Sequence, residues 1–385
     1  MSRRGTTTIR LATRGSDLAL RQASEVEEEL AGRRRTVELV EVETTGDRIQ
    51  DSLIAELGKT GAFVRSLDEQ VLDGSVEAAV HSMKDMPTDA PEALIVAAIP
   101  ERSFPEDVVV TPDGTPLADL PPGAVVGTSS LRRQAQILHH RPDLTVEPIR
   151  GNVDTRVEKL LAPRLQREHQ ARMDDNIDGT DEFERTTEEW FDDLGELERQ
   201  ALERHADTEY DAVVLARAGL ERLGLAHHVE FESLPTSRFV PAPGQGAIAV
   251  TSRDGEVAQS IHDALDHPRT RVEVTVERTI LAELGGGCIA PIGVHAVVQG
   301  EHVHVDVQVF SRDGSEKIEL SRDVPVERYL AKTREVAREL EERGATALIQ
   351  AARREVEGPT DEKVGADEAT DDAEPETDEE SGAEE

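Results

Sequence analysis

Strand-like and helix-like segments alternate along the chain from residue 8 to about residue 250. Residues 8–13 are typical of a strand, and residues 17–30 of a helix with one apolar face. The order repeats with a strand at 37–43, a helix at 61–72 and a strand at 76–80. Such alternation predicts an α/β fold, in which helices cover mostly parallel sheets.

A chain of 385 residues is longer than one hydrophobic core usually serves, so we expect several domains. The pattern divides into a first lobe at residues 8–104, completed by about 245–264, and a second lobe at 105–240. From about residue 267 it changes to a helix, three strands and a further helix, which predicts a small α+β domain at 267–355. That domain carries Cys288, the only cysteine.

The formal net charge is −37, and only six residues are lysine. Residues 357–385 contain 14 acidic residues and one lysine, which predicts a disordered tail. A second acidic segment, at about 161–206, interrupts the second lobe. An acidic, lysine-poor surface suits a salt-rich cytoplasm, so we expect a halophilic source; an ordinary acidic protein with a charged tail is the alternative. The negative field disfavours a nucleic-acid partner.

Several classes of protein are excluded by what the sequence lacks. One cysteine cannot form an internal disulfide, the first residues lack the apolar core of a secretory signal, and the longest apolar runs are shorter than the roughly 20 residues that cross a bilayer. We therefore expect a cytoplasmic protein without a membrane partner. The sequence has no phosphate loop, no dinucleotide-binding glycine motif after the first strand, and no paired histidines spaced for a metal, so no metal site is expected.

Two predicted strands end in turns rich in serine and threonine, at residues 13–16 and 128–130. Each turn precedes a predicted helix, where free backbone N–H groups and hydroxyls bind anions. The alternative is that both turns serve only as helix N-caps.

Five arginines follow strands or flank these turns: Arg14, Arg132, Arg133, Arg150 and Arg156. A guanidinium group binds carboxylate or phosphate through two parallel N–H bonds. In so acidic a chain the set predicts a binding site for a polyanion, although for any one of the five a surface salt bridge is the simpler explanation.

Lys84 and Asp85 lie in the segment HSMKDMP, at the end of a predicted strand, where ligands bind in open α/β folds. A carboxylate beside an ammonium group stays ionised and can exchange protons; an exposed ion pair without function is the alternative. Cys288 follows three glycines, which leave space around its sulfur. We therefore expect an accessible thiol and not the inert, buried state that is usual for a free cysteine.

Together these segments resemble the porphobilinogen deaminases, also called hydroxymethylbilane synthases. The similar motifs, in the family's order, are RLATRGSDLALRQ (10–22), HSMKDMP (81–87), VVGTSSLRRQAQ (125–136), HRPDL (140–144), RGNVDTR (150–156), PGQGA (243–247) and GGGCIAPIG (285–293). The resemblance covers roughly residues 8–355 apart from the acidic segment, and its motifs are highly specific.

The resemblance implies two lobes like those of periplasmic binding proteins, a small α+β domain that carries the cysteine loop, and a monomer. It implies that four porphobilinogen molecules condense head to tail, with loss of ammonia, into hydroxymethylbilane. The growing chain would start on a dipyrromethane cofactor held by Cys288 through a thioether. Asp85 would stabilise cationic pyrrole intermediates and assist proton transfer. The carboxylate arms of cofactor and substrate would be bound by Arg14, Ser16, Lys84, Thr128, Ser130, Arg132, Arg133, Arg150 and Arg156.

The chain departs from the family pattern before the phenylalanine of AELGKTGAF (55–63). The family usually has two lysines there, whereas this chain has Glu56 and a shifted Lys59. The competing class is a two-lobed anion-binding protein without catalysis, because a fold does not fix a function.

Overall fold

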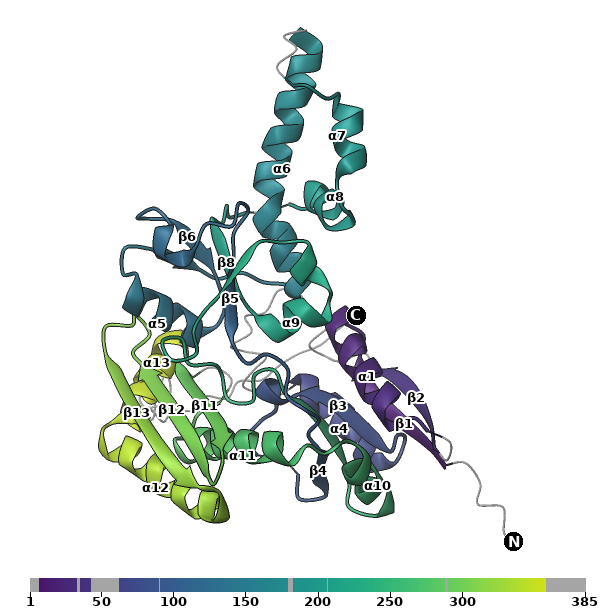
Figure 1. Cartoon of the computed structure of the whole chain (residues 1–385), viewed down its shortest axis with the longest axis vertical. Helices are drawn as coiled ribbons and strands as arrows, with labels where there is room; N and C mark the ends of the chain where they lie inside the picture. Colours follow the sequence, from purple (N-terminus) through teal and green to yellow (C-terminus); the bar gives the residue numbers. More distant parts are fainter. Residues whose placement is uncertain are drawn as a thin grey trace, which may run out of the picture.

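The computed structural model describes residues 7–32, 35–42, 62–89, 91–178, 183–205, 207–287 and 290–357. These residues form two five-stranded sheets and one three-stranded sheet, each with its own helices (Figure 1). Helices pack on both five-stranded sheets, which confirms the predicted α/β class with two lobes.

The first lobe is built on a sheet with the order β2-β1-β3-β10-β4, in which β10 runs antiparallel to its neighbours. Its strands are β1 (Thr7–Arg14), β2 (Arg35–Val42), β3 (Ala78–Ser82), β4 (Leu94–Ala98) and β10 (Ile248–Arg253). Its helices are α1 (Asp17–Leu30), α4 (Ala62–Asp73) and α10 (Glu256–Leu265). Side chains alternate across β1, so Ile9 and Leu11 pack with α1 and α10, whereas Ala12 packs with α4 on the other face.

The second lobe repeats this arrangement in the order β7-β6-β8-β5-β9, with β5 antiparallel. Its strands are β5 (Asp107–Val110), β6 (Val125–Gly127), β7 (Thr145–Glu147), β8 (Ala212–Ala216) and β9 (Phe231–Ser233). Its helices are α5 (Leu131–His140), α6 (Val153–Asp178) and α9 (Arg217–Arg222).

The chain crosses twice between the lobes. Residues 99–106 lead from β4 to β5, and residues 234–247 lead from β9 to β10. The antiparallel strand of each sheet therefore arrives directly from the other lobe, and β10 inserts between β3 and β4 although it follows them by about 150 residues in sequence.

A C-terminal unit, residues 268–357, packs beside both lobes (Figure 1). Its elements are α11 (Pro268–Glu283), β11 (Ile292–Gln299), β12 (His302–Phe310), β13 (Lys317–Pro325), α12 (Tyr329–Glu342) and α13 (Ala345–Glu357). The three strands form an antiparallel meander, and the helices cover it through a core of valine, leucine and isoleucine. Helix α13, which was not predicted from the sequence, follows α12 after a turn at Gly344.

The acidic segment is helical. Helix α6 continues to Asp178, and α7 (Thr187–Asp193) and α8 (Glu196–Glu203) fold back along it, so the three form a helical arm that projects from the second lobe (Figure 1). Leu165, Trp190 and Ala201 make its small core. Helix α7 ends at Asp193, and Gly195 is the N-cap of α8, so the chain turns between these two helices.

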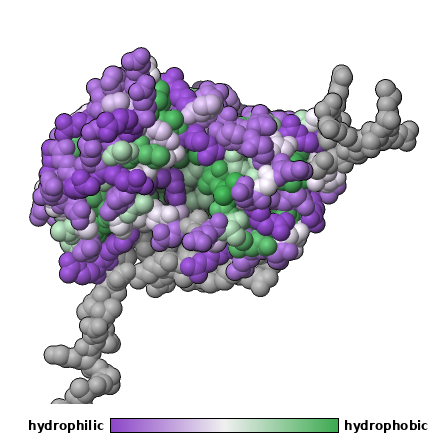
Figure 2. All heavy atoms as spheres, turned by 90° about the horizontal axis from the view of Figure 1, so that it is seen from below, coloured by the Kyte–Doolittle hydropathy of each residue, from purple (hydrophilic) through white to green (hydrophobic). Residues whose placement is uncertain are grey.

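Four short 3-10 helices complete the described elements: η1 (Met83–Asp85), η2 (Leu117–Asp119), η3 (Leu225–His227) and η4 (Val326–Arg328). Figure 2 shows hydrophilic residues over most of the face that it presents, in keeping with the acidic composition. Among the helices of the described residues, none is both long and apolar enough to cross a membrane.

Candidate active site

The residues singled out in the sequence gather where parallel strands end and helices begin. Arg14 ends β1 and Ser16 caps α1, whereas Lys84 and Asp85 form η1 directly after β3. In the second lobe, Thr128 follows β6, and Ser130 is the N-cap residue of α5. The first turn of α5 contains Arg132 and Arg133. Arg150 lies just before α6, and Arg156 lies in its first turn. This is the sheet edge at which open α/β folds bind ligands.

The loop of Lys84 and Asp85 rests on the second crossing. The backbone N–H of Met83 donates to the carbonyl oxygen of Ala247 at 3.0 Å. Gly244 has a φ of +76°, and a Cβ there would lie 2.7 Å from Cγ of Met83. A side chain at position 244 would therefore displace the loop, which explains a glycine in the PGQGA segment.

In the Thr-Ser-Ser turn of the second lobe, some of the polar groups form hydrogen bonds within the protein. The Ser130 N–H donates to Oγ1 of Thr128 at 3.2 Å, and Oγ of Ser129 donates to the carbonyl of Ile149 at 2.6 Å. Ser130 is the N-cap residue of α5, yet its hydroxyl makes no capping bond in the described structure. Its hydroxyl and the start of α5 are therefore suited to an anion.

Lys84 and Asp85 of the first lobe lie in the electrostatic field of Arg133 and Arg156 of the second. The strongest influence on the pKa of Lys84 is Asp85, which raises it, but desolvation together with Arg133 and Arg156 brings the pKa below its ordinary value. Desolvation, helped by Arg133 and opposed by Asp85, lowers the pKa of Arg156 to about 10. Three cations act on Asp85 and on one another here, and Asp107, which also raises the pKa of Lys84, offsets part of their charge. A bound polyanion would balance the rest.

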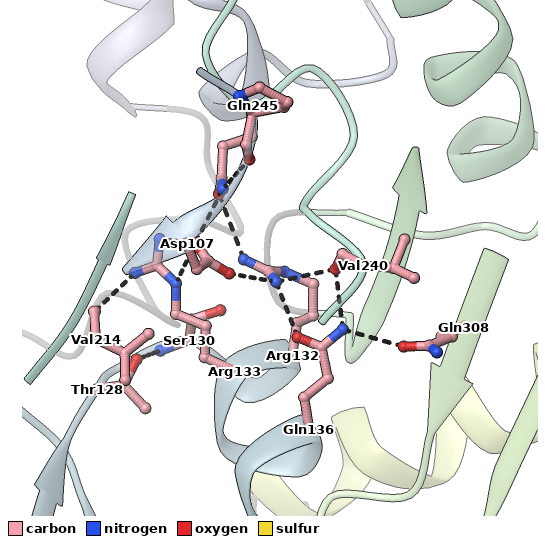
Figure 3. A network of polar contacts seen from close by, with 11 residues as sticks. Asp107, Thr128, Ser130, Arg132, Arg133, Gln136, Val214, Val240, Gln245 and Gln308 are labelled. Atoms are coloured by element: carbon pink, nitrogen blue, oxygen red, sulfur yellow. Dashed lines mark hydrogen bonds and ion pairs between the residues drawn. The ribbon is translucent and has the colours of Figure 1, made fainter. Parts of the chain in front are cut away.

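A buried carboxylate organises the arginines of α5 (Figure 3). Asp107, at the start of β5, accepts from Arg132 at 2.7 Å and from Arg133 at 2.8 Å. Burial raises the pKa of Asp107, but the two guanidinium groups outweigh it and hold the pKa well below its ordinary value. Gln245 of the second crossing also donates to Asp107, at 2.9 Å.

The contacts divide the predicted arginines into two kinds. The terminal nitrogens of Arg132 donate to Asp107, Gln136, Gln245 and the carbonyl of Val240, so this buried side chain joins α5 to the second crossing. In the described part of the chain, Arg156 donates only through Nε, to the carbonyl of Gly151 at 2.8 Å. The terminal nitrogens of Arg156 can therefore donate hydrogen bonds to a ligand, whereas those of Arg132 already donate to groups of the protein.

The cysteine turn is described only up to Gly287, so Cys288 lies outside the described residues, as do Glu56 and Lys59. The turn begins with a Schellman motif: the N–H of Gly286 donates to the carbonyl of Leu281 at 2.8 Å, and that of Gly285 to Ala282 at 2.9 Å. Gly285 has a φ of +63°, the left-handed conformation that this motif needs. The first two glycines therefore end α11 sharply before the cysteine.

Sequence reasoning did not identify Asp107 and Gln245 as members of the site. The available signal for Asp107 is an acidic residue directly before a run of three valines that must be buried. Gln245 lies in the PGQGA motif, but the motif does not show that its side chain reaches Asp107.

Comparison with known proteins decides the family. Residues 9–170 and 195–260 match the dipyromethane cofactor binding domain of porphobilinogen deaminase, and residues 271–342 match its C-terminal domain. A probable porphobilinogen deaminase of Halobacterium salinarum is 56% identical over 390 residues, covering 90% of this chain and 98% of that protein. A porphobilinogen deaminase of Desulforudis audaxviator is 37% identical, covering 89% and 97%. The chain belongs to the porphobilinogen deaminase family.

The porphobilinogen deaminase match leaves out residues 171–194, which lie in the outer part of the helical arm. Only this outer part, the end of α6 and α7, lies outside the matched family domain. Among solved structures, a TRAP periplasmic solute binding protein from Roseobacter denitrificans is 11% identical, covers 89% of this chain and 99% of that chain, and gives a TM-score of 0.34.

The donor set fits the cofactor for which the matched porphobilinogen deaminase domain is named. A dipyrromethane carries carboxylate arms, and the facing surfaces of the lobes supply an ammonium group, guanidinium groups and a hydroxyl that binds no backbone N–H of its own helix. Such groups form the strong, charge-assisted hydrogen bonds that carboxylates accept.

Proposed function

We propose that this protein joins four porphobilinogen molecules head to tail and releases hydroxymethylbilane, in tetrapyrrole biosynthesis. In each round the bond between the aminomethyl carbon and its nitrogen breaks, and ammonia leaves. The same carbon then bonds to a pyrrole α-carbon, which loses its proton. A dipyrromethane on Cys288, when bound, would supply the first such α-carbon, and water would cleave the finished chain from it and supply the hydroxyl group of the product.

The observation that carries the proposal is the meeting of Lys84 and Asp85 with Arg133 and Arg156 from the opposite lobe. The cations suit the acetate and propionate arms of pyrroles, and the carboxylate suits the positive charge that develops as ammonia leaves. An interaction that strengthens only as this charge develops speeds the reaction instead of merely tightening binding. We assign this role to Asp85, together with proton transfer.

The remaining predicted residues take binding roles in this proposal. The hydroxyl of Ser130 makes no capping bond, and the terminal nitrogens of Arg156 donate to none of the described residues, so we assign both to the direct binding of carboxylate arms. We propose the same role for Arg14, Ser16, Lys84 and Arg150, and a supporting one for Thr128, whose Oγ1 accepts from the N–H of Ser130. Arg133, whose nitrogens donate to Asp107 and to the carbonyl of Val214, contributes its positive charge to the binding of the same arms. Arg132 acts by holding α5 against the second crossing.

Intact-protein mass spectrometry tests the proposal directly. Freshly purified wild type should carry the added mass of a two-pyrrole adduct, and Cys288→Ser should carry none and should not turn over porphobilinogen. An unmodified wild-type chain that still forms hydroxymethylbilane would disprove the attachment. A loaded chain that releases no ammonia from porphobilinogen would disprove the reaction and favour a two-lobed anion-binding protein without catalysis.

We further propose that the protein is a cytoplasmic monomer that acts on a small molecule, without nucleic-acid or membrane partners, and that residues 267–355 form its third domain. The net charge of −37 supports both the salt-rich cytoplasm and the lack of a nucleic-acid partner, because negative charges repel phosphates.

A further inference from the structure

Arg278 reaches from α11 of the C-terminal unit to the loop that contains Lys84 and Asp85. One terminal nitrogen donates to the carbonyl oxygens of Met83 and Met86, both at 3.1 Å, and the other donates to that of Pro87 at 2.6 Å. One partly buried guanidinium group therefore holds three carbonyls that surround the two functional residues.

The residue before Arg278 ties the same helix to the second crossing. Glu277 is fully buried, accepts from the N–H of Gly244 at 2.7 Å, and forms an ion pair with Arg102 of the first crossing at 2.7 Å. The N–H of Met83 in turn bonds to Ala247, three residues beyond Gly244. The loop is thus held on one side by Arg278 and on the other by a crossing that Glu277 fixes to the same helix.

Helix α11 leads directly to the glycine turn that precedes Cys288. A single rigid element therefore contacts the loop of Lys84 and Asp85 and also ends at the cysteine turn.

We propose that Arg278 is a positioning residue, which fixes the main chain of residues 83–87 so that Lys84 and Asp85 keep a constant place relative to the helix that carries the cysteine turn. This inference rests on the proposed function. Arg278 acts through the carbonyls of the loop and touches neither substrate nor cofactor. Its planar fork reaches three acceptors at once, whereas a lysine ammonium is a single point charge on a flexible stem.

Arg278→Met and Arg278→Lys test this proposal, with Arg271→Met as the matched control. Arg271 lies on the same helix and also donates to two backbone carbonyls, those of Val96 at 3.2 Å and Ala97 at 3.1 Å, but these belong to β4 and not to the loop. Arg271→Met also breaks an ion pair with Asp266 at 2.6 Å, so the control disturbs the packing of α11 as well. The two Met variants therefore separate a general loss of packing from a loss of loop position.

Hydrogen exchange of residues 83–87 provides a readout that does not depend on activity. Exchange at the amides of Met83 and Met86, which both donate hydrogen bonds in the wild type, should become faster in Arg278→Met and stay unchanged in Arg271→Met. In cofactor-loaded protein, kcat should fall at least about 10-fold in Arg278→Met with little change in KM, because displacing a catalytic group costs rate more than binding. Arg278→Lys should lie between wild type and Arg278→Met.

Unchanged exchange in Arg278→Met, or equal losses of kcat in Arg278→Met and Arg271→Met, would overturn the inference. If Arg278→Met fails to fold, Arg278→Lys decides by the same two measurements. A wild-type protein without activity would overturn the proposed function, and the exchange result would still show whether Arg278 fixes the loop.

Discussion

Two nitrogens of Arg133 donate to one oxygen of Asp107, at 3.0 and 2.8 Å, while the other oxygen accepts from Arg132 at 2.7 Å. All three side chains are buried. A carboxylate without access to water thus balances two guanidinium groups at the start of α5.

Replacing Asp107 with Asn should lower the free energy of unfolding by about 3–5 kcal/mol, because two buried cations lose their counter-charge. The pKa of Asp107 is lowered in the fold, so the stabilisation is present above the unfolded pKa of about 3.9 and is lost only as the pH falls toward the folded value. Denaturant unfolding should therefore give the same difference at pH 6 and pH 8.

The control for that measurement is Glu209→Gln, which breaks an exposed pair with Arg167. Such a pair contributes about 0–1 kcal/mol and is screened by salt. A loss in Asp107→Asn that disappears in molar KCl, like that of the surface pair, would contradict the buried role of Asp107.

Asp85→Asn should fold, should melt close to wild type, and should lose at least about 10²-fold in turnover, the scale for removing one electrostatic or acid–base group. Asn keeps the size of the side chain but neither the charge nor the proton exchange. Asp89→Asn is the matched control, since Asp89 is also exposed and lies four residues further along the chain. Steady-state assays and melting curves on the same samples decide; an active Asp85→Asn would require another catalytic group.

Lys84→Met should lower turnover at least about 10-fold, because a charged partner of a carboxylate arm is lost. The same change should raise the melting temperature at neutral pH. The fold lowers the pKa of Lys84, so its protonated form carries a cost at pH 7. This cost fades as the pH rises from the folded pKa to the unfolded value of about 10.4. The gain in melting temperature should therefore shrink toward pH 10. Lys332→Met is the control: this half-exposed lysine pairs with Glu335, and its replacement should give no gain at any pH.

The charge of −37 predicts that stability rises with KCl well beyond about 0.15 M, where ordinary surface charges are already largely screened.

Removing residues 358–385 leaves α13 complete and should leave turnover intact, because this segment has few apolar residues. Melting temperatures that stay flat from low to molar KCl would contradict the first expectation, and an inactive truncation would contradict the second.

Much of the fold followed from local pattern. The bounds of α1 were predicted to the residue and those of β1 to within one residue, because each combines a clear period with a clear start or stop. Periodicity could not show that β10 inserts between β3 and β4, since strand order depends on contacts between residues far apart in sequence.

For the candidate site, the sequence identified residue types but not their partners. Arg132 and Arg156 have the same chemistry and similar settings in sequence. The terminal nitrogens of Arg132 donate to Asp107 and to Gln245 of the second crossing, whereas those of Arg156 donate to none of the described residues. Only the fold distinguishes them, because the partners of Arg132 come from three separate segments. Arg278 was overlooked for the same reason: its acceptors are backbone carbonyls, which no sequence motif displays.

The two crossings have a consequence for synthesis of the chain. The sheet of the second lobe needs no residue beyond Ser233, whereas the sheet of the first lobe needs β10, which ends at Arg253. A ribosome therefore delivers the last strand of the second lobe before it delivers that of the first. The sheet of the N-terminal lobe can therefore receive β10 between β3 and β4 only after every strand of the second lobe's sheet has been synthesised.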